Sequence, residues 1–367
     1  MRIPIFEPDL TNSERINLLD AFDSGWISSQ GSYVTDFQNA FAKYHEVPYA
    51  IATSNCTTAL HLALTALNIG NGDEVICPDL TFIAPANMIR LVGAKPVLVD
   101  IENGSWAIDP DKIIEKVTDK TKAIIVVHPF GHSANMDAIL KISQEFGLKI
   151  IEDVAEAPGA YYNGKLLGTF GDISCFSFFA NKIMTTGEGG MVLTSDKKIS
   201  EKLVILRDHG MSSEKKYVHV LPGFNYRMTN MQAAIGLAQL NRFETILTKR
   251  ERQIETYKKF LSESEKLECR PIMPSCKPVH WLTTIVLISK EQRDPLVEYL
   301  NNQNIDIRQM VFPVHMAPYF LSEYKDEDFP VSTDISLRSI HLPSSTNLDK
   351  NTIKKICHLI INWLDKN

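Results

Sequence analysis

Short apolar runs alternate with amphipathic helical patterns between residues 50 and 151, and this alternation constrains the fold more than any other feature. The apolar runs lie at 50–53, 74–77, 96–99, 123–127 and 148–151. Helical patterns between them lie at 58–67, 84–92 and 136–146. Because the runs are nearly continuous in Val, Ile and Leu, they are typical of central strands covered on both faces. Repeated strand–helix units of this length predict an α/β fold with a mostly parallel central sheet covered by helices.

After residue 193 the pattern changes and indicates a second, smaller domain. Residues 230–262 predict one long helix, and a proline-rich stretch then serves as a connector. A smaller α/β segment follows, with predicted elements at 283–288, 292–303, 305–308 and 349–364. We therefore predict a lead-in over 1–30 that packs on the small domain, a large domain over 30–245 and a small C-terminal α/β domain over 246–367.

Composition and charge exclude several classes of protein. The chain has 367 residues, of which 44% are hydrophobic and 22% charged, and its net charge is −6 with both signs interspersed. This argues against a nucleic-acid partner. No run approaches 18 apolar residues, and the N-terminus has no signal-peptide core, so we expect no membrane contact. The six cysteines lack metal-like spacing. We expect reduced thiols in a cytoplasmic protein without a metal site.

Lys182 stands between the end of an apolar, aromatic run, Phe176–Phe179, and a glycine-rich turn, Gly187–Gly190. A lysine in this position can point into a cleft with its stem shielded from water. Desolvation disfavours the ammonium, so the amine becomes available as a nucleophile toward a carbonyl. A solvated loop lysine is the simpler alternative, because most charged side chains stay wet.

Other polar residues directly follow predicted strands, where ligands of open α/β sheets bind. Residues 53–58 open a helix with hydroxyls and free N–H groups, which suits a phosphate, although an ordinary N-cap would look the same. Residues 152–156 carry acids that could hold a protonated ring nitrogen or could simply lie at the surface. Ser177 precedes Lys182 by five residues. A phosphate cradle, a carboxylate and a shielded lysine are the parts that pyridoxal phosphate (PLP) needs.

Several ordered motifs resemble the DegT/DnrJ/EryC1/StrS family of sugar aminotransferases, which are PLP enzymes of fold type I, over essentially the full length of the chain. The matching motifs lie at 57–64, 72–76, 152–153, 176–178, 186–190 and 223–228. Four further motifs are similar to a branch of the family that aminates nucleotide-linked sugars. They lie at 26–29, 181–183, 227–230 and 311–319.

The resemblance implies a role for each matching residue at the cofactor. Lys182 would form the Schiff base, Asp153 would pair with the pyridine nitrogen, and Glu156 would lie near the phenolic oxygen. Two acids near one ring should raise the pKa of one of them. Phe82 would stack on the ring, or else is plain core. The phosphate would be held by Cys56, Thr57, Ser177 and, from the neighbouring subunit of a homodimer, Asn225.

By the same resemblance the reaction is transamination. L-glutamate would donate its amino group, and the acceptor would be the keto carbon, most simply C4, of a nucleotide-linked keto-deoxysugar such as GDP-4-keto-6-deoxymannose. Lys182 would act as leaving group and as general acid and base. The residues expected to bind the substrate are Trp26, Arg227, His315 and Tyr319, with Arg90, Arg308 and Trp281 as weaker candidates for the sugar-nucleotide side.

Three alternatives remain open from the sequence. The acceptor could be another keto-sugar or a small keto-phosphate. A PLP-dependent sugar dehydratase has a similar fold but carries histidine where Lys182 stands. A regulator that keeps the PLP fold without turnover would not need Asp153, Ser177 and Lys182 together.

Overall fold

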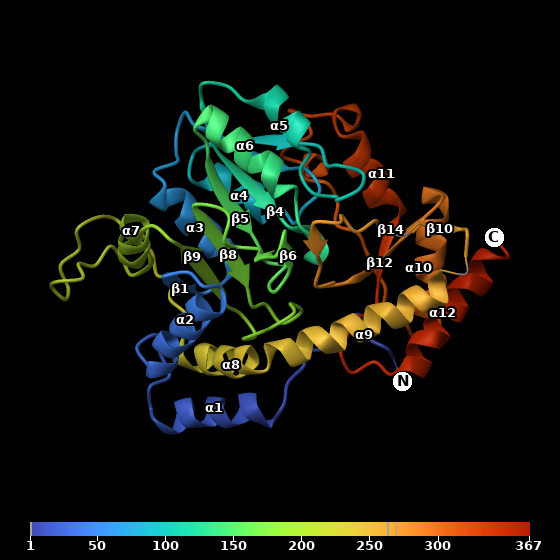
Figure 1. The fold of residues 1–367 in the computed structure, drawn as a ribbon, viewed down its shortest axis with the longest axis horizontal. Helices are drawn as coiled ribbons and strands as arrows, with labels where there is room; N and C mark the ends of the chain where they lie inside the picture. Colours follow the sequence, from blue (N-terminus) through green and yellow to red (C-terminus); the bar gives the residue numbers. More distant parts are fainter. Residues whose placement is uncertain (1, 263, 269) are drawn as a thin grey trace.

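The computed structural model describes residues 2–262, 264–268 and 270–367. A seven-stranded sheet in the order β1-β9-β8-β5-β4-β2-β3 forms the centre of the large domain (Figure 1). Its strands are β1 (Tyr49–Thr53), β2 (Glu74–Pro78), β3 (Lys95–Val99), β4 (Thr121–Val127), β5 (Lys149–Asp153), β8 (Ile173–Ser177) and β9 (Gly190–Thr194). Pairs from β8 to β3 are parallel, and β9 runs antiparallel to both of its neighbours. The predicted mostly parallel sheet is confirmed.

Helices cover both faces of this sheet, which explains the continuous apolar runs. In β4, Ile124 and Val126 join one core cluster, whereas Ala123, Ile125 and Val127 join the other. The helices of the first cluster are α2 (Ser32–Tyr44), α5 (Pro110–Lys116), α6 (Met136–Phe146) and α8 (Asn230–Asn241). The second cluster contains α3 (Cys56–Ala66), α4 (Ala84–Leu91) and α7 (Lys197–Arg207). Both faces of each strand are therefore apolar because both are buried.

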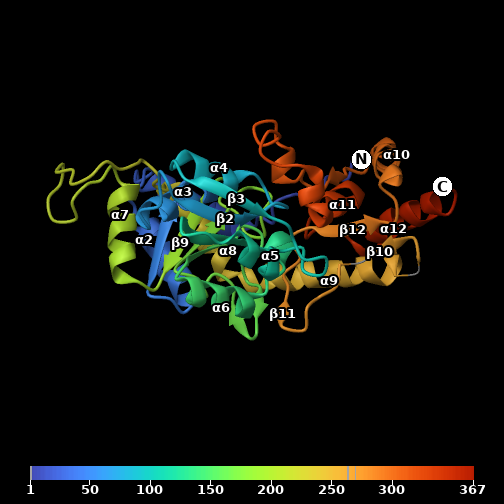
Figure 2. The same ribbon diagram turned by 90° about the horizontal axis from the view of Figure 1, so that it is seen from above.

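The small domain is built on a four-stranded antiparallel sheet in the order β10-β12-β14-β13. Its strands are β10 (Leu267–Glu268), β12 (Thr283–Leu287), β13 (Arg308–Gln309) and β14 (Ser339–Leu342). The helices of this domain are α10 (Arg293–Asn302), α11 (Pro330–Arg338) and α12 (Lys350–Leu364). A third sheet joins β6 (Tyr161–Tyr162) to β7 (Lys165–Leu166) and β11 (Cys276–Lys277). The helix α9 (Phe243–Leu261) runs from beneath the large domain to the small one (Figures 1 and 2).

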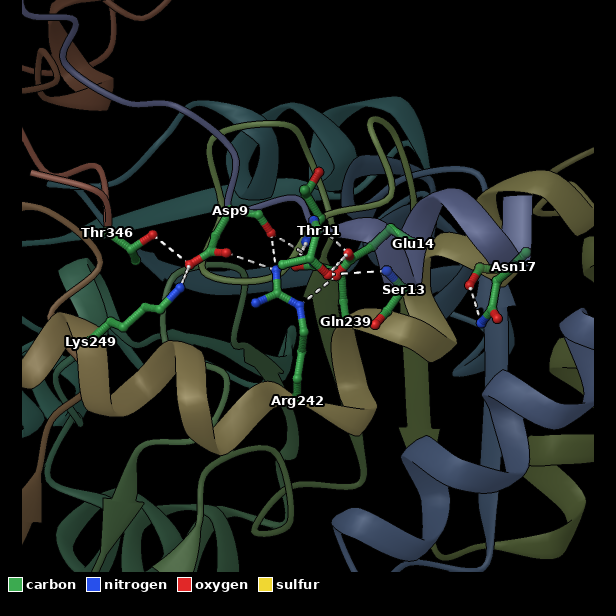
Figure 3. A network of polar contacts seen from close by, with 11 residues as sticks. Asp9, Thr11, Ser13, Glu14, Asn17, Gln239, Arg242, Lys249 and Thr346 are labelled. Carbon is green, nitrogen blue, oxygen red and sulfur yellow. Dashed lines mark hydrogen bonds and ion pairs between the residues drawn. The ribbon is translucent and has the colours of Figure 1, made fainter. Parts of the chain in front are cut away.

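The sequence predicts one helix over 230–262, but the structure has two, α8 and α9, separated at Arg242. The backbone of Arg242 leaves the helical region, with φ −119° and ψ 17°. Its guanidinium donates to Glu14 Oε1 at 2.6 Å and to Asp9 Oδ1 at 2.9 Å (Figure 3). Lys249 and Thr346 also bind the carboxylate of Asp9. The helix therefore changes direction where its side chain binds the N-terminal segment.

The lead-in is shared between the two domains. Residues 3–7 lie along the small domain, where Ile3 pairs with Ile305 and the backbone N–H of Glu7 donates to Ser345 Oγ. The helix α1 (Asn12–Asp23) instead packs against α8 (Figure 1). Its N-cap, Thr11, forms a capping box with Glu14. Residues 1–30 are predicted to pack on the small domain. The structure shows this packing for residues 3–7, whereas α1 packs on α8.

No helix in the described ranges is both long and apolar enough to cross a membrane. Five cysteines are unpaired and buried: Cys56, Cys77, Cys175, Cys276 and Cys357. The sixth, Cys269, lies outside the described residues.

Candidate active site

The carboxyl ends of β1 and β8 meet at a single glycine of β9. Gly190 pairs with Thr53 at the end of β1 and with Ser177 at the end of β8. A Cβ on Gly190 would lie 2.5 Å from the carbonyl carbon of Asn55 and 2.6 Å from Thr53 Oγ1. Only glycine lets the strands approach this closely, so the second glycine of the Gly189–Gly190 pair serves packing beside the site.

The loop after β1 forms an anion cradle at the start of α3. Asn55 caps the helix, because its side chain accepts from Thr58 N at 2.9 Å. The next two N–H groups, of Cys56 and Thr57, have no acceptor within the described part of the chain. Free N–H groups at a helix start favour a negative charge in front of them. Ser177 is buried at the end of β8.

Asp153 ends β5 in a buried position beside this cradle. Its Oδ1 accepts from Ala155 N at 3.0 Å and lies 4.0 Å from Cys56 Sγ. Burial, with a smaller contribution from the negative charge of Glu156, raises the pKa of Asp153 to about 6. Burial and the nearby Asp153 also raise the pKa of the Cys56 thiol, so Cys56 remains an uncharged part of the cradle.

Lys182 lies between a carboxylate and an aromatic ring. Its Nζ is 3.5 Å from Glu156 Oε1 and 3.6 Å from the ring centroid of Trp281. Only 12% of the lysine side chain is exposed. The other oxygen of Glu156 accepts from Phe130 N at 2.8 Å, and Trp281 Nε1 donates to Asn181 O at 2.6 Å. The predicted shielding of the lysine is present, and Glu156 is fixed within reach of it.

Glu152, the neighbour of Asp153, points to the opposite face of β5 and supports the site from behind. It accepts backbone hydrogen bonds from Gly168, Phe170 and Gly171. His128 Nδ1 accepts from Ala134 N at 3.2 Å, which leaves Nε2 to donate to Glu152 at 3.1 Å. Burial opposes ionisation of Glu152, but these donors outweigh it and lower its pKa. Glu152 is therefore a buried, fully bonded carboxylate rather than a ligand contact.

Asn225 and Arg227 lie on an irregular stretch that borders the cradle of their own chain. Tyr226 O accepts from Ser54 N at 2.8 Å, and the backbone of Arg227 forms an isolated antiparallel β-bridge with that of Thr53. Arg227 is held by an ion pair with Asp208 at 2.9 Å and donates to Asn225 Oδ1 at 3.0 Å. The preceding loop extends from the body of the large domain beyond α7 (Figures 1 and 2). A contact of Asn225 with a second subunit stays a prediction.

Three aromatic residues predicted at the site are exposed. The exposed fraction is 57% for Phe82, 59% for Trp26 and 47% for Tyr319. The Tyr319 hydroxyl donates to Asn87 Oδ1 at 2.6 Å, and Arg90 next to it pairs with Glu323. Their rings are available for stacking, and their predicted ligand contacts stay predictions.

His315 lies fully buried and ties the small domain to the end of β2. Its Nδ1 is 2.7 Å from Asp79 Oδ2, and its backbone N donates to Asp79 Oδ1 at 2.8 Å. Its Nε2 is 3.2 Å from Asp326 Oδ1, and its ring stacks on Phe329. Both ring nitrogens are therefore engaged within the chain, and its predicted contact with substrate would require these bonds to be exchanged. Arg308 lies in β13, paired with His341.

Two residues beside the site, Phe130 and Asp79, escaped the sequence analysis. Asp79 directly follows β2, and Phe130 comes three residues after the end of β4. Asp79 carries the same signal as Asp153, which is a polar side chain at the carboxyl end of a parallel strand. Phe130 acts through its backbone N–H, held by a left-handed conformation with φ 53°, and nothing in its residue type signals this.

Comparison with known proteins agrees with this geometry. The model of the DegT/DnrJ/EryC1/StrS aminotransferase family matches residues 8–361. The chain is 41% identical to a GDP-perosamine synthase of Escherichia coli O157:H7, covering 98% of this chain and 97% of that protein. It is also 41% identical to a GDP-perosamine synthase of Vibrio cholerae, with 99% of each covered.

Solved structures give the same result. Helicobacter pylori PseC, an aminotransferase involved in the biosynthesis of pseudoaminic acid, superposes with a TM-score of 0.94 at 26% identity, with 100% of both chains covered. A Streptococcus pneumoniae protein assigned as a sugar aminotransferase, solved in a PLP form, gives a TM-score of 0.93 at 26% identity, covering 100% of this chain and 99% of that one. From the extent of the family match and the identity to these relatives, the chain belongs to the DegT/DnrJ/EryC1/StrS aminotransferase family.

Proposed function

We propose that this protein is a PLP-dependent aminotransferase that moves the amino group of L-glutamate to the keto carbon of a nucleotide-linked keto-deoxysugar. The observation that carries the proposal is the shielded amine of Lys182, 3.5 Å from Glu156 and on the same side of the sheet as Asp153 and the anion cradle. An amine, an acid and a cradle are needed together by a cofactor that has an aldehyde, a basic ring nitrogen and a phosphate.

The residues fit PLP chemically. Asp153 is a buried acid whose pKa is raised, so its ionised form needs a cation against it, and the protonated pyridine nitrogen would supply one. The N–H groups of Cys56 and Thr57, which find no acceptor among the described residues, suit the phosphate together with the hydroxyl of Ser177. The exposed ring of Phe82 could cover one face of the pyridine.

When bound, PLP supplies an electron sink for the negative charge that develops at the carbon losing its proton. The chain's own residues do the rest. Lys182 Nζ would take the proton from the substrate carbon and deliver it to C4′ of the cofactor. The same amine would therefore be both general base and general acid. Glu156, fixed by Phe130 N–H, orients that amine. Trp281 covers the amine and excludes water from it.

The acceptor follows from the relatives. Three relatives at 41% identity are GDP-perosamine synthases. We therefore propose GDP-4-keto-6-deoxymannose as acceptor, amination at C4, and a place in the biosynthesis of surface polysaccharide. Trp26, Arg227, His315 and Tyr319 are the substrate-binding candidates. The proposal includes a cytoplasmic homodimer in which Asn225 of one subunit reaches the phosphate in the other.

The test combines covalent trapping with turnover. Borohydride reduction of the resting protein should attach a pyridoxyl phosphate to the peptide that contains residue 182, as read by mass spectrometry. Incubation with glutamate and a panel of nucleotide 4-keto-sugars should give an amino-sugar product with GDP-4-keto-6-deoxymannose and not with the others. Lys182→Ala should abolish turnover while the protein remains folded. A label at any other lysine, or normal turnover by Lys182→Ala, would overturn the proposal.

A further inference from the structure

A small cavity lies at the junction of the two domains, behind the wall formed by Phe130. Its volume is about 60 Å³, and its polar lining comes mainly from Lys258, Arg270, His132 and His280. Phe130 lines the cavity, and its backbone N–H donates to Glu156 on the catalytic side. The cavity is therefore a separate space from the site that contains Lys182.

Its polar lining is basic. Arg270 donates to the carbonyls of Pro129 and Ser105, but its Nε is buried and has no hydrogen-bond partner among the residues that the structure describes. Neither Arg270 nor Lys258 forms an ion pair with a carboxylate in the part of the chain that the structure describes. No Asp or Glu lines the cavity among the same residues. A partly buried guanidinium without a counter-charge is costly, and an anion would offset that cost.

The two histidines add donors to this lining. Their rings pack edge to face with centroids 5.5 Å apart. Burial, with the positive charges of Arg270 and Lys258, lowers the pKa of both and brings that of His280 to about 3. At neutral pH each ring is therefore uncharged and can donate one N–H to an acceptor. Two cations and two neutral donors thus surround one small space.

The backbone around the cavity is held in an uncommon conformation. Trp106, Phe130 and His280 all line it with φ between 49° and 53°. Bulky side chains rarely adopt positive φ, and such strain collects at binding and catalytic sites. Gly131, next to Phe130, also has a positive φ of 89°. A Cβ there would lie 2.7 Å from His280 N, so the backbones approach each other closely at this point.

We propose that this cavity is a binding site for one small oxyanion of the size of inorganic phosphate or sulfate. The guanidinium of Arg270, the ammonium of Lys258 and the imidazole N–H groups are its donors. Charge-assisted hydrogen bonds from a guanidinium suit such an anion. The bound anion would also neutralise Arg270, which donates to Pro129 O next to Phe130. It would therefore change the electrostatic potential at Glu156 without touching substrate.

Isothermal titration calorimetry of the PLP-loaded protein tests the proposal, because loading fills the cradle at Cys56 and Ser177. The probes are phosphate and sulfate, with chloride and acetate compared at equal ionic strength. Phosphate and sulfate should bind at one per chain and the other two more weakly. Arg270→Gln should weaken phosphate binding by about 10-fold or more, as loss of a charge-assisted hydrogen bond implies.

A matched pair of lysines keeps the test decisive if Arg270→Gln does not fold. Lys258 lines the cavity, and Lys259 is also exposed on the same helix but does not line it. Lys258→Met should weaken binding by about 2- to 5-fold, the size expected for one exposed charge, and Lys259→Met should leave it unchanged. Absence of saturable phosphate binding, equal effects of the two lysine variants, or wild-type affinity in folded Arg270→Gln would each overturn the proposal.

Discussion

Lys182 and Trp281 face each other across the junction of the two domains, with Nζ 3.6 Å from the centroid of the indole ring. The lysine follows β8 of the large domain, whereas the tryptophan begins the stretch that leads into β12 of the small one. Arg250, buried in α9, holds the carbonyl of Trp281 at 2.9 Å. The reactive amine is therefore positioned by both domains at once.

Replacing Trp281 by leucine should slow the reaction with glutamate. Loss of the cation–π contact, about 0.5–2 kcal/mol, predicts a decrease of about 2- to 30-fold in the rate of that half-reaction. Trp281→Phe keeps an aromatic face but loses the hydrogen bond to Asn181, so it should retain most of the rate. Stopped-flow absorbance with α-deuterated glutamate measures the effect, and the isotope effect should increase in the leucine variant. An unchanged rate and isotope effect would exclude this role.

Asp153→Asn should inactivate the enzyme and yet stabilise the protein from which the cofactor has been removed. The pKa of Asp153 is raised from 3.8 to about 6, so ionisation opposes folding above pH 6 by about 2–3 kcal/mol. This penalty shrinks as pH falls from 6 and is absent below pH 4. Urea unfolding of both proteins at pH 4 and pH 7.5 measures it. A gain in stability of the variant that is equal at both pH values would contradict the explanation.

Arg242→Ala should destabilise the protein strongly, because in the network of Figure 3 it removes the cation that pairs with Glu14 and leaves Lys249 as the cation paired with Asp9. Removing one partner of a buried ion pair costs about 3–5 kcal/mol. Lys112→Ala breaks an exposed ion pair with Glu115 and should leave the free energy of unfolding nearly unchanged. It is therefore the matched control. Chemical unfolding of both variants at pH 7 tests the difference.

The same network predicts the response to acid. Burial alone would raise the pKa of Asp9 and Glu14, but for Asp9 the bonds from Lys249, Thr346 and Arg242, and for Glu14 those from Thr11 and Arg242, lower both to about 2. Because the folded-state values lie below the unfolded ones, their stabilisation is complete above about pH 5 and is lost as pH falls toward 2. Arg242→Ala should therefore lose less stability than the wild type between pH 5 and pH 2. Parallel pH profiles would contradict this assignment.

His315→Gln should destabilise the protein, and more at low pH than at high pH. Burial opposes the charged ring, but the bonds to Asp79 and Asp326 outweigh it and raise the pKa of His315. Its stabilisation is therefore complete below the unfolded value near 6.5 and is lost as pH rises. The variant leaves buried Asp79 with fewer partners, at a cost of about 1–3 kcal/mol. Thermal unfolding at pH 6 and pH 9 measures this. A larger loss at pH 9 would contradict it.

The sequence was sufficient for elements defined by local patterns. Continuous apolar runs gave the strands of the large sheet, because burial on both faces leaves no polar alternation. The site residues at strand ends, such as Asp153, were found because strand ends lie at one edge of a parallel sheet. The sequence pattern does not predict the helix break at Arg242, because this break depends on contacts with Asp9 and Glu14, more than 220 residues away.

Roles that depend on tertiary contacts could not be predicted. Nothing in the residues around Trp281 indicates that it covers Lys182, because the contact spans two domains. The motif around His315 was interpreted as facing substrate, and its burial against Asp79 depends on how the small domain meets β2. The strand β14 was also missed, because its four residues, Ser339–Leu342, alternate too briefly to give a pattern.

The position of β9 between β1 and β8 determines when the anion cradle can exist. Its two halves, residues 53–58 and 177–190, are distant in the chain and meet where Gly190 pairs with both Thr53 and Ser177. During synthesis the ribosome must therefore release the chain past Thr194 before any phosphate can be held. Cofactor capture follows completion of the sheet and cannot guide the folding of its first strands.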